Sequence, residues 1–157
     1  METLAPTPTC RHSRIHLVTR SPTEFIDLTD QVEAFVAEAG IDSGLVNIQS
    51  LHTTTGIVVN EHEPLLLMDF ARLLEQAAPG HAQYRHDDMA ARTVNLAPGE
   101  RPNGHAHCRA LLLGTSVSLN LDGGRLQLGC WQRIFLVELD GPRPRQISVL
   151  ILGEGAR

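Results

Sequence analysis

The sequence predicts an α+β fold, largely of antiparallel β-sheets, with two main amphipathic helices and one short helix. A length of 157 residues fits one domain, and its 42% apolar content is enough for a core. Two segments carry apolar residues at helical spacing, while turn signals at 122–124 and 140–142 separate strand-like segments. Successive hairpins imply antiparallel pairing, which argues against a doubly wound parallel sheet.

The N-terminal half begins with an irregular segment. Residues 1–12 contain prolines and threonines without periodicity, so we expect a flexible tail there and a single folded domain over 13–157. Residues 15–19 alternate between apolar and polar side chains, as in a strand, and residues 28–39 share one helical face until Gly40 ends the helix. Residues 44–59 predict two short strands interrupted at 53–56.

The second helix starts at Pro64, which suits a first helical turn, and ends before Pro79. Residues 81–103 lack a period and are long for a connection, so they are either functional or mobile, and we favour a functional role. Asn103 can cap a short helix that Gly114 ends. The remaining expected strands are 116–121, 125–128, 131–139 and 146–152.

Charge and composition exclude several classes of function. With 13 basic and 18 acidic residues the net charge is −5 and no dense basic cluster occurs, so neither nucleic acid nor an anionic membrane is expected as a partner. No uninterrupted apolar run is long enough to span a membrane. Three cysteines without a CxxC pair, and no signal-peptide pattern, predict a cytoplasmic protein.

The histidines are unevenly distributed. Six of the eight lie between His52 and His107. His52 follows an apolar strand face and precedes Thr53 and Thr54, whose hydroxyl groups could bind an anion. The alternative for His52 is an ordinary core or turn residue.

Two further segments contribute imidazoles. His105 and His107 would point about 200° apart on a helix, so only one of them can face a given site. Near a helix N-terminus such an imidazole stays neutral and can bind a metal, although a surface cap residue is the alternative. His86 stands beside two carboxylates, which could orient its ring or simply lie in a solvated loop. Together, His52, His86 and His107 match the three-ligand plan of a zinc site with one open position.

Other candidate residues lie in the strands. Trp131 and Gln132 could wall a pocket, although packing in the core is the commoner role of tryptophan. Arg133, like Arg143 and Arg145, could contact phosphate or instead form an ion pair. Glu61 could act as a general base or merely close its strand.

Four segments together resemble the YjbQ family, whose members are described as secondary thiamine-phosphate synthases. They are GLVNIQSLHTTTGIVVNE at 44–61, YRHDD at 84–88, NGHAHCRALLLGTS at 103–116 and DGGRLQLGCWQRIFLVELDGPRPR at 122–145. The likeness extends from Ile15 to Gly153. One departure is Cys130, where the family commonly has Thr or Ser before the tryptophan.

The resemblance implies a YjbQ-like domain that forms a homotrimer, with a histidine-lined metal site near the subunit interfaces. Its metal ligands would be His52, His86 and His107, with His105 at a variable position. The implied activity joins a pyrimidine methyl diphosphate to a thiazole phosphate and releases pyrophosphate. Zinc suits three imidazoles, whereas magnesium is the usual partner of a diphosphate.

Three hypotheses follow. The first is a metal-dependent enzyme acting on a small phosphorylated or heterocyclic molecule, with Glu61, Asn103 and Gln132 as catalytic residues. Its substrate or anion contacts would be Thr53, Thr54, Ser116, Trp131 and Arg133. The second is a non-catalytic trimeric module that binds a metal or an anion. The third is a structural trimer whose histidines stabilise the interface.

Overall fold

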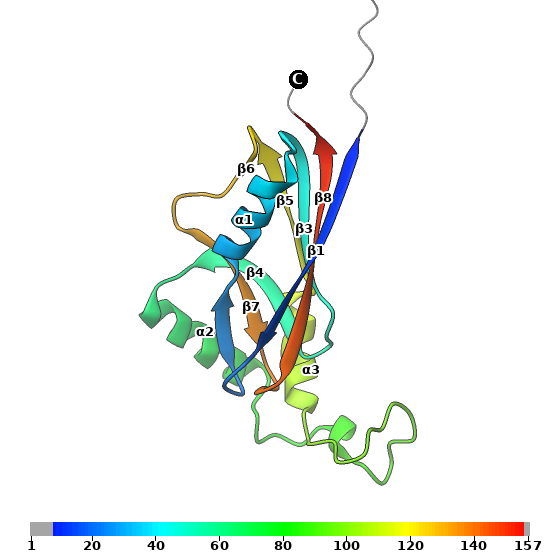
Figure 1. The fold of residues 1–157 in the computed structure, drawn as a ribbon. Coiled ribbons are helices and arrows are strands. Elements are labelled where there is room, and N and C mark those ends of the chain that lie inside the picture. Colours follow the sequence, from blue (N-terminus) through cyan, green and yellow to red (C-terminus); the bar gives the residue numbers. More distant parts are fainter. Residues whose placement is uncertain (1–7, 156–157) are drawn as a thin grey trace, which may run out of the picture.

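The computed structural model describes residues 8–155 and contains two antiparallel sheets and three α-helices (Figure 1). The five-stranded sheet has the order β1-β8-β3-β5-β6 and the three-stranded sheet the order β2-β7-β4. The first sheet consists of β1 (Thr9–Val18), β8 (Pro144–Glu154), β3 (Ser43–Ser50), β5 (Ser116–Asp122) and β6 (Arg125–Leu126). The second consists of β2 (Glu24–Asp27), β7 (Gln132–Glu138) and β4 (Thr55–Glu61). The predicted α+β class is confirmed.

Three helices and one short 3₁₀ helix cover the sheets. Helix α1 (Thr29–Ala39) lies against the upper half of the five-stranded sheet, while α2 (Pro64–Ala77) and α3 (Gly104–Leu113) lie lower (Figure 1). The 3₁₀ helix η1 (Arg85–Asp87) belongs to a loop that extends from the lower end of the molecule. None of the helices among residues 8–155 is both long and apolar enough to cross a membrane.

Strand β7 is the centre of the core because both of its faces are buried. Ile134 and Leu136 pack toward α1 and the five-stranded sheet, whose contribution includes Val46 and Ile147. The alternate residues of β7, led by Phe135, pack with α2 and α3 in a second cluster. The sequence of such a strand is a nearly continuous apolar run because neither of its faces is exposed to solvent.

The expected helices are confirmed with small shifts of their ends. Gly40 ends α1 in the left-handed conformation, with φ of 65°, and Pro64 starts α2, whose first amide groups donate to the side chain of Glu63. Asn103 stands at the N-terminus of α3, but its side chain does not cap the helix. Its amide is directed to Asp140 instead.

The strands differ more from the expectation. Strand β1 begins at Thr9 rather than after residue 12, because β8 continues to Glu154 and supplies pairing partners as far as Gly153. Residues 1–7 of the expected tail lie outside the described residues. Strand β2 was not expected, and β6 ends at Leu126. Edge strands depend on their neighbours for pairing, so their limits are poorly encoded locally.

Asp27, the last residue of β2, joins three elements. Its carboxylate accepts hydrogen bonds from Arg133 Nε at 2.7 Å and from the Thr29 N–H at 2.9 Å, and it lies 3.0 Å from His62 Nδ1. Partial burial would raise the pKa of Asp27, but the hydrogen bonds from Arg133 and Thr29 outweigh it and lower that pKa to about 2. A carboxylate with a lowered pKa stabilises the fold only while it is ionised.

We expect Asp27→Asn to reduce the free energy of unfolding by about 1 kcal/mol at neutral pH, since it removes one partly exposed ion pair. The difference from wild type should shrink as the pH falls from the ordinary value of 3.8 through about 2, where Asp27 becomes protonated in the folded state. Urea unfolding across this pH range measures the difference. Asp69→Asn, at an exposed pair with Arg72, is the control; an effect of Asp27→Asn that does not vary with pH would contradict the assignment.

Candidate functional site

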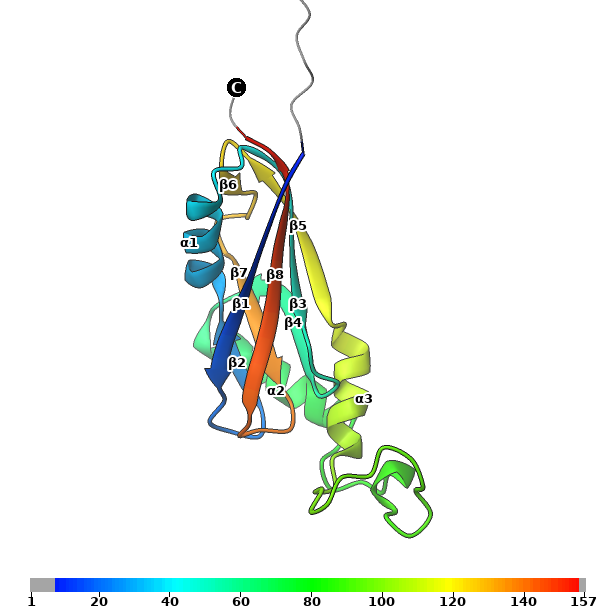
Figure 2. The same cartoon turned by 45° about the vertical axis from the view of Figure 1, so that its right-hand side comes forward.

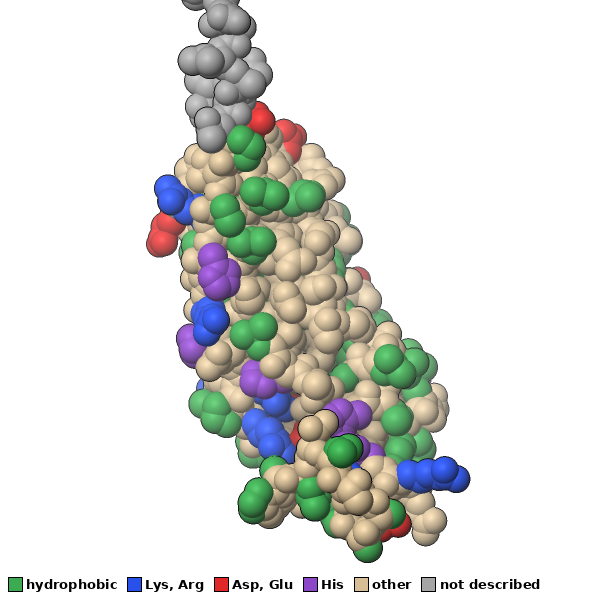
Figure 3. Space-filling model, turned by 90° about the vertical axis from the view of Figure 1, so that its right-hand side faces the viewer, with side chains coloured by type: hydrophobic (Ala, Val, Ile, Leu, Met, Phe, Trp, Pro, Cys, Tyr) green, Lys and Arg blue, Asp and Glu red, His purple; other side chains and the backbone are tan. Residues whose placement is uncertain are grey.

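The candidate site lies at the lower end of the sheets, where several connections meet (Figures 1 and 2). They are the turn before β4, η1 with the loop that follows it, the start of α3 and the connection from β7 to β8. On the face viewed in Figure 3, histidine and arginine side chains gather at this end. The site is therefore built from segments that are far apart in the sequence.

His86 and His107 form the centre of the site. Their ring centroids are 4.5 Å apart at an angle of 61°. His86 Nε2 is buried without a hydrogen-bond partner among the described residues, and the nearest carboxylate oxygen, Glu100 Oε1, is 3.7 Å away. Burial, and then the neighbouring His86, lower the pKa of His107, so this imidazole is neutral near pH 7. Two imidazoles in contact thus offer nitrogen atoms to a ligand or a cation.

The contact between η1 and α3 positions this pair. Asp87 Oδ1 accepts hydrogen bonds from the N–H groups of Asn103 and Gly104, each at 2.9 Å. Gly104 also permits a close approach, because a Cβ atom there would lie 2.4 Å from Cβ of Tyr84. These contacts fix η1 on the first turn of α3 and bring His86 beside His107.

Asn103 connects the pair to a buried carboxylate. Its side chain is 6% exposed, and its Nδ2 donates to Asp140 Oδ2 at 2.9 Å. Its Oδ1 has no hydrogen-bond partner among the described residues. A buried amide oxygen without a donor is costly, so this atom can accept a hydrogen bond from a bound water or ligand.

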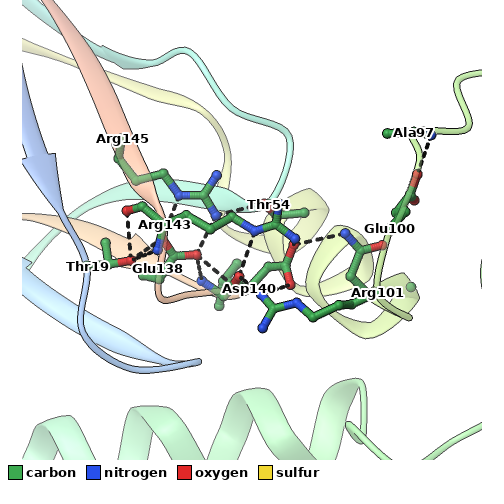
Figure 4. Close-up of polar contacts among 12 residues, drawn as sticks. Thr19, Thr54, Ala97, Glu100, Arg101, Glu138, Asp140, Arg143 and Arg145 are labelled. Carbon is green, nitrogen blue, oxygen red and sulfur yellow. Dashed lines mark hydrogen bonds and ion pairs between the residues drawn. The ribbon is translucent and has the colours of Figure 1, made fainter.

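A buried ion pair supports this end of the sheets (Figure 4). Glu138, fully buried, accepts hydrogen bonds from Arg145 Nε and Nη2 at 2.5 Å and from the Thr19 hydroxyl at 3.0 Å. It also accepts the N–H of Asp140 at 2.8 Å, and Arg145 Nη2 donates to Thr54 Oγ1 at 3.0 Å. The network therefore links the β7–β8 connection, which carries Asp140, to the turn before β4.

His52 belongs to this turn but already has a partner. Its Nε2 accepts a hydrogen bond from the Gln146 N–H at 2.8 Å, which requires a lone pair on that nitrogen. Burial and the charge of Arg145 lower the pKa of His52, so the ring is neutral with its proton on Nδ1. In this arrangement His52 offers a hydrogen-bond donor, and its Nε2 is not available to a metal.

The other predicted site residues are divided between two places. Thr53 is exposed in the turn next to His52, and Ser116 is exposed at the start of β5. Glu61 and Gln132 pair with each other at the opposite end of the three-stranded sheet, since β4 runs from Thr55 to Glu61 away from the histidines. Trp131, 70% exposed, immediately precedes Gln132. Within a single chain, Glu61, Gln132 and Trp131 therefore lie away from the imidazole pair.

Arg133 lies with that distant group and is already engaged. Its guanidinium donates to Asp27 and, at 2.7 Å, to Asp30 Oδ1. Of the two interpretations of Arg133, the ion pair is the one that the structure shows. Cys130 is a free, exposed thiol in the loop that precedes β7.

The predicted set of three histidines is not assembled around one point. Within residues 8–155, no three His, Cys, Asp or Glu side chains are placed to hold a metal ion together. Of these three histidines, His86 and His107 lie together, His86 Nε2 is unpartnered among the described residues, and His107 is neutral near pH 7. Neutral imidazole nitrogen atoms are common ligands of divalent cations. Such a site would need its remaining ligands from water, substrate or another chain.

Several polar residues of this site were not predicted. Arg92 and Glu100 form an ion pair beside His86, and Arg101 and Asp140 form another beside Asn103. The sequence signals were the irregular segment 81–103 and the turn at 140–142. Neither signal specifies side-chain partners, because both pairs depend on how the loops fold back on the sheet.

The comparisons with known proteins agree on one family. The sequence profile of the family described as UPF0047 protein YjbQ-like matches residues 13–154. A UPF0047 protein from Archaeoglobus fulgidus is 40% identical over 136 residues, covering 87% of this chain and 97% of that protein. The UPF0047 protein YugU from Bacillus subtilis is 36% identical over 141 residues, covering 88% and 97%. The crystal structure of a YbjQ-like protein of unknown function from Sulfolobus solfataricus superposes with a TM-score of 0.85 at 36% identity, covering 94% of this chain and 100% of that one.

Proposed function

The chain belongs to the family of YjbQ-like UPF0047 proteins, and within this family we propose that it is an enzyme acting on a small phosphorylated molecule at the imidazole pair. The observation that carries the proposal is the contact of His86 with His107, 4.5 Å between ring centroids, with His86 Nε2 unpartnered. An imidazole that is neutral near pH 7, as that of His107 is, presents a nitrogen lone pair to a divalent cation.

The surroundings of the pair favour a phosphorylated substrate. All 13 basic side chains of the sequence are arginines, and four of them, Arg92, Arg101, Arg143 and Arg145, take part in ion pairs around the site. Guanidinium groups bind phosphate oxygens through bidentate hydrogen bonds. The proposed reaction of the thiamine-phosphate synthase type, in which pyrophosphate leaves as a new carbon–nitrogen bond forms, needs such neutralisation of charge.

Within this proposal His86 and His107 hold a divalent cation, preferably zinc, because imidazole nitrogen is a better ligand for zinc than for magnesium. A cation bound there would neutralise negative charge on the phosphate groups. Glu100, whose Oε1 lies 3.7 Å from His86 Nε2, would lie near the cation and add a negative charge that favours it. His52 would donate a hydrogen bond from Nδ1 to the anion.

We also propose a homotrimer in the cytoplasm. Apart from Asp122 and Glu154 at the ends of β5 and β8, the outward side chains of β3, β5 and β8 are uncharged, and three leucines among them, Leu45, Leu150 and Leu152, are exposed. Figure 3 views this face, whose middle carries no acidic or basic side chain. An uncharged face with exposed leucines is typical of a surface that another subunit covers. The free state of Cys10, Cys108 and Cys130 suits a reducing compartment.

A non-catalytic binding module is the second candidate. It is favoured by the position of Glu61, the predicted general base, at the far end of β4 from the imidazole pair. In this case the arginines and the imidazoles would bind a phosphorylated molecule without converting it.

The test combines metal analysis with an assay. Elemental analysis of gently purified protein should find about one transition metal per subunit, and light scattering should give the mass of three chains. With a pyrimidine methyl diphosphate and a thiazole phosphate, pyrophosphate release should stop in a chelator and return with added zinc. Protein that takes up no zinc would discard the metal site, and turnover that persists in the chelator would discard metal dependence. Binding of the phosphorylated compounds without turnover would favour the module.

A further inference from the structure

We propose that Arg101 and Arg143 form a phosphate pocket next to the imidazole pair, which anchors a phosphate group of the substrate. The pocket has a volume of about 310 Å³ and is lined by these two arginines together with Gly99, Glu100 and Pro142. That volume is at the lower end of the range of small-molecule sites. The statement that the bound phosphate belongs to a substrate rests on the proposed function. The existence of the pocket does not.

Asp140 holds both arginines in place (Figure 4). Arg143 Nε donates to the Asp140 carbonyl oxygen at 3.0 Å, and its Nη2 lies 2.7 Å from Oδ2. Arg101 Nη2 donates to the same carbonyl oxygen at 3.1 Å and lies 3.6 Å from Oδ1. Each guanidinium uses only some of its five N–H groups in these contacts. The others remain for an anion, on a side chain that is already oriented.

The charges leave this pocket positive. Arg101 and Arg143 face one carboxylate, that of Asp140, which is 7% exposed. Glu100, the acidic residue among those that line the pocket, is bonded to Arg92 and to the N–H of Ala97. The pocket therefore carries an excess of one positive charge before a ligand enters, and a phosphate dianion would reverse its sign rather than add to an existing negative charge.

Asn103 indicates a second feature of the ligand. Its Nδ2 and Arg143 Nη2 meet on the same oxygen of Asp140, at 2.9 and 2.7 Å, so the amide and the guanidinium are neighbours. The unpartnered Oδ1 of this buried amide can only accept a hydrogen bond. A molecule that satisfies both groups has a phosphate and, close to it, a hydroxyl or N–H donor. The ligand class is thus a phosphorylated alcohol or a phosphorylated amine or heterocycle bearing an N–H group.

Calorimetric titration of the full-length protein with inorganic phosphate tests the pocket. Arg101→Gln and Arg143→Gln should each weaken phosphate binding by about tenfold to a hundredfold, the usual loss for one charged hydrogen-bonding group. Arg143→Lys should fall between wild type and Arg143→Gln, because it keeps the charge without the planar guanidinium. Arg72→Gln, which removes the same charge from an exposed pair on α2, should bind phosphate like wild type. Circular dichroism should show that all variants are folded.

Unchanged affinity in Arg101→Gln and Arg143→Gln, or an equal loss in Arg72→Gln, would overturn the proposal, as would wild-type protein that does not bind phosphate. His107→Ala separates this inference from the proposed function. If that variant loses zinc but keeps its phosphate affinity, the pocket exists even where the metal site has been destroyed. If the assay of the wild type finds no turnover while Arg143→Gln still loses phosphate, the proposed enzyme activity fails and the pocket stands.

Discussion

Replacing Glu138 by glutamine is expected to lower the free energy of unfolding by about 3–5 kcal/mol at neutral pH, as for other buried ion pairs that lose one partner. The carboxylate is fully buried and holds both Nε and Nη2 of Arg145 at 2.5 Å. Arg145 is itself 5% exposed, so the substitution leaves a buried guanidinium without its counter-charge. The glutamine amide group would also face donors that now meet a carboxylate oxygen, including the N–H of Asp140.

The effect should depend on pH. Burial alone would raise the pKa of Glu138, but hydrogen bonds from Arg145 and from the N–H of Asp140 outweigh it and hold that pKa below its ordinary value of 4.5. The stability that the carboxylate contributes is therefore complete above the ordinary value and is lost as the pH falls through the lowered pKa of the folded state. The difference between wild type and Glu138→Gln should shrink under acidic conditions.

Urea unfolding of both proteins at neutral and acidic pH measures this difference. Glu38→Gln, at an exposed position of α1, is the matched control and should stay within about 0.5 kcal/mol of wild type. The double variant Glu138→Leu with Arg145→Met should be more stable than Glu138→Gln, because no charge remains buried. A loss in Glu138→Gln no larger than in Glu38→Gln would show that the pair is not buried as described.

Local spacing predicted the helices but not the edges of the sheets. The apolar positions of α1 and α2 recur along one face of each helix. Gly40 marks the end of α1 and Pro64 the start of α2, so the local sequence determines these limits. Strand β2 has only four residues and no clear alternation. It exists because β7 offers it a pairing edge, which is information from a distant part of the chain.

The candidate site shows the same division between local and distant information. His86 and His107 could be singled out by residue type, and the structure brings their rings together. Glu61 and Gln132 were grouped with them although antiparallel pairing of β4 with β7 places both residues at the other end of the sheet. Asp140 was read only as part of a turn, since its contacts with Arg101 and Arg143 form after the loops have folded back.

His107→Ala is expected to abolish stoichiometric zinc binding, whereas His105→Ala should leave it within about twofold of wild type. The two residues are neighbours on α3, but their side chains point in different directions because a helix turns by about 200° over two residues. His107 contacts His86, with 4.5 Å between the ring centroids, while His105 lies near Tyr84, with 6.4 Å between theirs. Losing one of only two imidazoles would remove the pair of ligands that we propose for the ion.

Elemental analysis and calorimetric titration with zinc measure both variants, and thermal unfolding without metal shows whether either substitution harms the fold. His105→Ala controls for the loss of an imidazole from the first turns of α3, because it changes the composition of the helix in the same way. Equal loss of zinc in the two variants would mean that the helix as a whole, and not the contact with His86, governs binding. Retention of zinc by His107→Ala would show that the metal binds away from the imidazole pair. His107 would then be a neutral hydrogen-bonding group beside the proposed phosphate pocket.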